Sequence, residues 1–130
     1  MAIDVSAQTR YWKEGSADDL EAARTLLGAG KIRHAGFFVH LAIEKAIKAR
    51  VVAATRDMPP RTHDLLFLAQ RAVIDLTQEQ REFLARVQVY CLEGRYPDEA
   101  PPPPAARTVA RDLQEAQEMV RWLTDPLSNP

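Results

Sequence analysis

The segment from residue 32 to about residue 54 constrains the fold more than any other part of the chain. Its apolar residues recur every three or four positions, which is the spacing of one face of an α-helix. These residues are Ile32, Ala35, Gly36, Val39, Ala42, Ile43, Ala46 and Ile47. Phe37, Phe38 and Leu41 widen the apolar surface beyond a single stripe. A helix that is apolar on two sides lies either at the centre of a bundle or against a second copy of itself.

The remaining sequence predicts four further helices and no strand. Ala, Leu, Glu, Arg and Gln are plentiful, Gly is scarce, and no stretch alternates apolar and polar residues with period two. The first spans about residues 6–27 and either runs through Ser16 or starts afresh there. A short helix follows Pro60 and is capped by Thr62. The next runs from the capping box of Thr77 and Gln80 to Gly94, and the last lies between Pro104 and Asp125. We therefore predict an all-α, antiparallel up-and-down bundle of about five helices, in a single domain over residues 1–130.

Composition narrows the class of protein further. The 130 residues suit one domain, and 17 Lys and Arg against 18 Asp and Glu give a formal charge of -1. This balance argues against a surface coated in positive charge for non-specific nucleic-acid binding. Cys91 is the only cysteine, which excludes an intrachain disulfide and a Cys-rich zinc site. The first residues lack the pattern of a signal peptide, and no apolar run is long enough to span a bilayer, so we expect a cytoplasmic protein without membrane contact.

Four motifs follow one another along the chain. They are Asp19-Leu20-x-x-Ala23 with Leu26-Leu27, then Glu44-Lys45-Ala46-Ile47-Lys48-Ala49, then Thr62-His63-Asp64-Leu65, and last Arg95-Tyr96-Pro97-Asp98. In this order, the sequence between about Tyr11 and Leu123 resembles a prokaryotic HEPN domain (higher eukaryotes and prokaryotes nucleotide-binding domain). The resemblance implies a helical bundle that is usually a homodimer. It also implies frequent pairing with a small nucleotidyltransferase in toxin–antitoxin-like modules, and roles in nucleotide or RNA chemistry.

The chain departs from the HEPN ribonucleases at one position. Those enzymes carry an arginine followed four to six residues later by a histidine, around the start of the last long helix. Here no histidine follows Arg95, and none occurs anywhere after His63. A pair of similar spacing, Arg33 and His40, lies instead at the start of the second helix. The catalytic histidine of the family therefore cannot be assigned, and we name no catalytic residue.

The second helix carries one group of candidate ligand-binding residues. His40, Lys45 and Lys48 lie near Glu44 at helical spacings of three and four. Either they form a polar cluster that contacts phosphate, or Glu44 and Lys48 are an ordinary surface pair one turn apart. His40 and Glu44 have no evident third ligand, so we expect no metal here.

Two loops carry the other candidates. His63 either anchors the loop before the short helix or faces a ligand cleft, while Asp64 is favoured there by the helix dipole alone. Arg95, Tyr96 and Asp98 place a cation, an aromatic ring and a carboxylate on the connection to the last helix. Arg95 would grip a phosphate and Tyr96 would stack on a base, or the three would pack and pair locally.

Three hypotheses follow for the function. The first is a dimeric nucleotide- or RNA-binding module, paired with a small nucleotidyltransferase and needing no cofactor. The second is an RNA-cleaving toxin that uses Arg95 with a noncanonical histidine, His63 or His40, because histidine exchanges protons near neutral pH. The third is a purely structural bundle whose second helix forms an interface with a protein.

Overall fold

The computed structural model describes residues 2–92 and 102–127, and these residues form helices without any strand. The elements are α1 (Val5–Gly28), α2 (Ile32–Thr55), α3 (Leu65–Arg71), α4 (Gln78–Gln88) and α5 (Ala106–Thr124), followed by a short 3₁₀ turn (Asp125–Leu127). The prediction of an all-α bundle of five helices with a short third helix is confirmed. Within the described ranges, no helix is long and apolar enough to cross a membrane.

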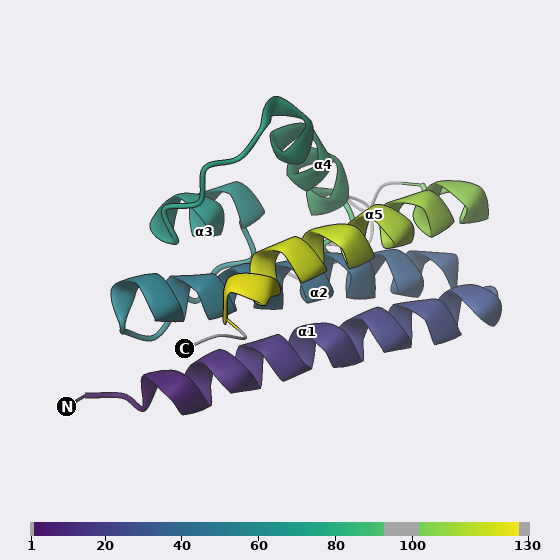
Figure 1. The fold of residues 1–130 in the computed structure, drawn as a ribbon. Helices are drawn as coiled ribbons and strands as arrows, with labels where there is room; N and C mark the ends of the chain where they lie inside the picture. Colours follow the sequence, from purple (N-terminus) through teal and green to yellow (C-terminus); the bar gives the residue numbers. More distant parts are fainter. Residues whose placement is uncertain (1, 93–101, 128–130) are drawn as a thin grey trace.

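The three long helices lie side by side, with α3 and α4 above them (Figure 1). The α1–α2 pair is antiparallel. α5 instead runs in the same direction as α2, since α3 and α4 lie between them in the chain (Figure 1). A contact near their carboxyl ends shows this alignment, because the Arg50 guanidinium of α2 donates to the Leu123 carbonyl of α5 at 3.3 Å.

Helix α2 is the centre of the bundle and packs against the other four helices. The stripe residues that it buries are Ala35, Gly36, Val39, Ala42, Ile43, Ala46 and Ile47. Ile43 and Ile47 are fully buried, and burying a side chain of this size contributes about 1.5–3 kcal/mol. Phe37 and Leu41 are only half-buried within this chain. The central position of α2 therefore accounts for most of its apolar surface, and these two side chains are left at its edge.

Helix α1 is continuous through Gly15 and Ser16, so no fresh helix starts there. The Ser16 hydroxyl is buried and donates to the carbonyl of Ala42 on α2 at 2.7 Å instead of capping its own chain. Gly15 allows a close approach, because a Cβ at this position would lie 3.1 Å from the Lys45 side chain. The helix begins at an Asp4 cap, whose carboxylate accepts a backbone N–H of the first turn.

The ends of the short helices follow side-chain caps. Thr77 and Gln80 form the predicted reciprocal capping box at the start of α4. At α3, however, the cap is Asp64 rather than Thr62, because the Asp64 carboxylate accepts the backbone N–H three residues on at 3.1 Å. The Thr62 hydroxyl instead accepts the backbone N–H of Asp64, in the loop before the helix. Helix α4 ends at Gln88, before the position that the sequence predicted.

Candidate functional site

Glu44 organises a polar cluster inside the bundle. One carboxylate oxygen, Oε2, accepts from the Lys48 Nζ at 3.0 Å, and the other, Oε1, accepts from the His63 Nδ1 at 2.8 Å. The Glu44 side chain is only 4% exposed. A buried carboxylate is tolerated when it is paired and hydrogen-bonded, and Glu44 is both. We call Glu44, Lys48, His63, His40 and Gln88 the Glu44 cluster.

His40 and Gln88 fix the loop that carries His63. The His40 Nε2 lies 3.0 Å from the carbonyl oxygen of His63, and the Gln88 side chain donates to the same oxygen at 3.0 Å. Because a carbonyl oxygen only accepts, Nε2 of His40 carries a proton. Gln88 also accepts the backbone N–H of Leu65 at 2.9 Å. The loop before α3 is thus tied to both α2 and α4, and the anchoring role expected for His63 is carried by its backbone.

The Lys48 ammonium is buried beside Glu44, with its side chain 9% exposed. It lies 5.2 Å from the centre of the Trp12 ring of α1, within the range of a cation–π contact. Lys48 therefore stabilises the α1–α2 packing and compensates Glu44, and little of its charge faces solvent.

Lys45 belongs to a different contact. Its Nζ lies 2.8 Å from the Asp19 carboxylate on α1, and this pair joins α1 to α2 away from the Glu44 cluster. Of the predicted binding residues, the structure thus brings His40, Lys48 and His63 together and leaves Lys45 outside. His63 alone of these three is well exposed, with 40% of its side chain accessible, whereas the His40 ring is fully buried.

Arg95, Tyr96 and Asp98 lie outside the described residues. In the sequence, Arg95 follows Gln88 of the cluster by seven positions. The assignment of these three residues to ligand binding therefore stays a prediction.

A second polar network joins α4 to α5, and sequence reasoning missed it. The Tyr90 hydroxyl donates to Asp112 Oδ2 at 2.5 Å, and the Arg86 Nε donates to Asp112 Oδ1 at 3.1 Å. Burial, with the hydrogen bond and charge of Asp112, raises the pKa of Tyr90 above the usual range. Asp112 is fully buried on the inner face of α5. The signal that the sequence offered was a carboxylate among the apolar residues of this helix, directly before Leu113.

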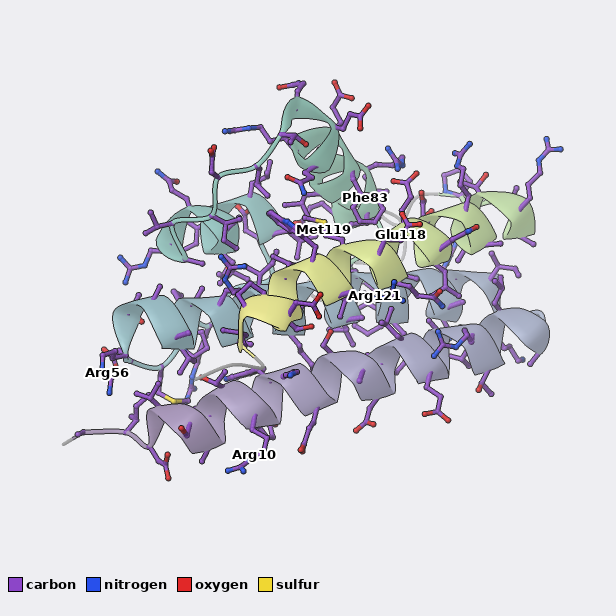
Figure 2. The ribbon with its side chains drawn as sticks, viewed as in Figure 1. Arg10, Arg56, Phe83, Glu118, Met119 and Arg121 are labelled. Atoms are coloured by element: carbon purple, nitrogen blue, oxygen red, sulfur yellow. The ribbon has the colours of Figure 1, made fainter. Side chains whose placement is uncertain are left out.

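Metal binding finds no support in the described part of the chain, where no three or more His, Cys, Asp or Glu residues are grouped to hold an ion. Two arginines near the end of α2, Arg50 and Arg56, lie in different settings. Arg50 is tied to the α5 carbonyl, and burial lowers its pKa from the usual value. Arg56 projects outward at the end of α2, and Arg10 projects from α1 (Figure 2).

The bundle and its buried Glu44 cluster define an all-α domain in which the loop before α3 is held against a central helix. Residues 9–125 match the family model of the HEPN domain. The chain therefore belongs to the HEPN domain family, as its sequence motifs predicted.

A solved structure supports the same fold. The crystal structure of TT1696 from Thermus thermophilus superimposes with a TM-score of 0.74 and is 27% identical in sequence. The similarity covers 91% of this chain and 97% of that one. A comparison with curated proteins finds no match.

Proposed function

We propose that this HEPN domain is a binding module for a nucleotide or a short RNA, and that His63 and Arg95 contact its phosphate. The observation that supports the proposal is the exposed His63 ring held by a buried carboxylate. Because Lys48 compensates the charge of Glu44, the cluster presents the His63 imidazole to a ligand without an unpaired negative charge behind it. Arg95 would supply bidentate hydrogen bonds, and Tyr96 would stack on a base, with Asp98 close in sequence.

Calorimetric titration with ATP and with a short single-stranded RNA tests this function. We expect binding by the wild type and a loss of about tenfold or more in affinity for Arg95→Ala and His63→Ala, since a charge-assisted hydrogen bond contributes about 1.5–3 kcal/mol. Arg24→Ala, an exposed arginine on α1, is the matched control and should bind as the wild type does. If the wild type binds neither ligand at high micromolar concentration, the proposal is wrong.

The same module is proposed to be a homodimer that pairs with a small nucleotidyltransferase in a toxin–antitoxin-like system. Membership of the HEPN family supports the pairing. The half-buried Phe37 and Leu41 on α2 support a second copy as their cover. Sedimentation velocity over a concentration series should give a dimer for the wild type and a monomer for Leu41→Glu. A wild type that stays monomeric would contradict this assembly.

A second candidate function, RNA cleavage, is favoured by one distance. The 2.8 Å bond from Nδ1 of His63 to Glu44 is the arrangement in which a carboxylate orients an imidazole for proton transfer. His40 is too buried to reach a substrate, so this candidate rests on His63 with Arg95. Cleavage of labelled RNA should disappear in His63→Ala and Arg95→Ala. Equal cleavage by all three preparations would indicate a contaminating nuclease and remove this candidate.

A further inference from the structure

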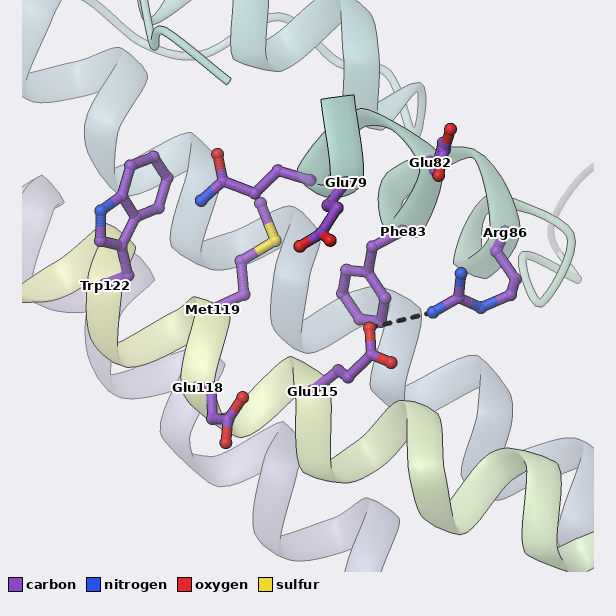
Figure 3. Close-up of a pocket in the computed structure, with 9 residues that line it drawn as sticks. Glu79, Glu82, Phe83, Arg86, Glu115, Glu118, Met119 and Trp122 are labelled. Carbon is purple, nitrogen blue, oxygen red and sulfur yellow. Dashed lines mark hydrogen bonds and ion pairs between the residues drawn. The ribbon is translucent and has the colours of Figure 1, made fainter. Parts of the chain in front are cut away.

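The surface between α4 and α5 is hollowed into a groove of about 600 Å³. Phe83 from α4 lines this groove together with Met119 and Trp122 from α5 (Figure 3). Phe83 and Met119 are buried and form an apolar floor, whereas Trp122 is 41% exposed. An exposed tryptophan beside an apolar floor is typical of a protein interface, where aromatic residues contribute most of the binding energy.

The rim of this groove is acidic. Glu79 and Glu82 line it from α4, and Glu115 and Glu118 line it from α5. Arg86 is the one cation among the lining residues that the structure describes, and it already donates to Glu115 at 3.0 Å (Figure 3). The described lining thus carries four carboxylates and one guanidinium, whose charge is already engaged. Such a groove repels phosphate groups and attracts positive charge.

We propose that this α4–α5 groove docks a cationic amphipathic helix of another protein. Apolar side chains of that helix would pack on Phe83, Met119 and Trp122, while its Lys or Arg residues would pair with the glutamates of the rim. This is the helix-in-groove mode of recognition, with charge setting the specificity. The docking surface lies on α4 and α5, so it does not depend on nucleotide binding at His63.

Fluorescence anisotropy with a labelled model peptide tests the proposal. The probe is an amphipathic helical peptide of Leu and Lys, and a peptide of the same pattern with Glu in place of Lys is its counterpart. We expect the full chain to bind the Lys peptide with micromolar affinity at low salt and to leave the Glu peptide unbound. Removing two exposed rim charges in Glu79→Gln/Glu118→Gln should weaken binding about fivefold.

Two further variants separate docking in the groove from general attraction to negative charge. Glu14→Gln/Glu21→Gln removes the same charge from exposed positions of α1, and it should change the affinity less than about twofold. Trp122→Ala should weaken binding about tenfold even at high salt, because it removes an apolar contact. Circular dichroism would verify that each variant is folded.

The inference is overturned by any of three results. The first is no binding of the Lys peptide by the folded wild type. The second is equal weakening by the α1 and the groove charge variants, which would make the attraction non-specific. The third is a wild type that self-associates without binding the peptide and a Trp122→Ala variant that no longer self-associates. This result would assign the groove to a second copy of this chain.

Discussion

Replacing Glu44 by glutamine should destabilise the fold strongly, because it leaves the Lys48 ammonium buried without its carboxylate. Breaking a buried ion pair by removing one partner costs about 3–5 kcal/mol. The Trp12 ring 5.2 Å away offsets about 1 kcal/mol of this. The glutamine also keeps an oxygen that accepts from His63. We therefore expect Glu44→Gln to lower the free energy of unfolding by about 2–4 kcal/mol.

A double-mutant cycle separates this charge effect from lost packing. Lys48→Met keeps the length of the side chain and removes its charge, so Glu44→Gln/Lys48→Met contains neither ion. The double variant should be more stable than Glu44→Gln, with a coupling energy of about 2 kcal/mol between the two positions. Urea unfolding near neutral pH, followed by far-ultraviolet circular dichroism, measures each free energy. Glu21→Gln on the exposed face of α1 is the control and should change stability by less than about 0.5 kcal/mol. Additive effects of the two substitutions would refute the reasoning.

Two further predictions concern Tyr90. Gly36→Ala would place a methyl group 3.0 Å from the buried Tyr90 ring. We therefore expect the free energy of unfolding, measured with urea, to fall by about 1–3 kcal/mol. An unchanged midpoint would show that the ring moves freely. Because folding raises the pKa of Tyr90, its contribution to stability is complete below the unfolded tyrosine value of about 10 and is lost as the pH rises above it. Unfolding free energies measured on both sides of that value should fall less steeply for Tyr90→Phe than for the wild type, and equal slopes would contradict the shift.

The sequence predicted those elements whose signals are local. The period of α2 and the Thr77 capping box each arise from residues three or four positions apart, and both are confirmed. Ser16, with Asp19 three residues on, has a similar local signature, yet it lies inside α1, because its hydroxyl donates to Ala42 of α2 instead of capping. At α3, a better acceptor, Asp64, displaced Thr62. A tertiary contact, which no local pattern contains, therefore explains why no helix starts at Ser16. At α3, the sequence offered two neighbouring cap residues, and the prediction chose the wrong one.

The same division holds for the candidate site. The pairing of Glu44 with Lys48 is one helical turn long and follows from spacing alone. The bonds that bring His63 and Gln88 to it join residues 19 and 25 positions apart, and nothing in the sequence signals them. Gln88 in particular resembles any polar residue at a helix end. Sequence reasoning therefore found the carboxylate of the site and missed the amide that holds its loop.

The common direction of α2 and α5 has a consequence for the order of folding. Arg50 and Leu123 are 73 positions apart, so docking α5 requires closure of a long loop, whereas α1 and α2 are joined by a tight turn. The α1–α2 hairpin can therefore form early from near neighbours in the chain. Until α5 docks, the side of α2 that it covers stays exposed, and Tyr90 lacks its hydrogen-bond acceptor Asp112. Completion of the core thus depends on the last long helix of the domain.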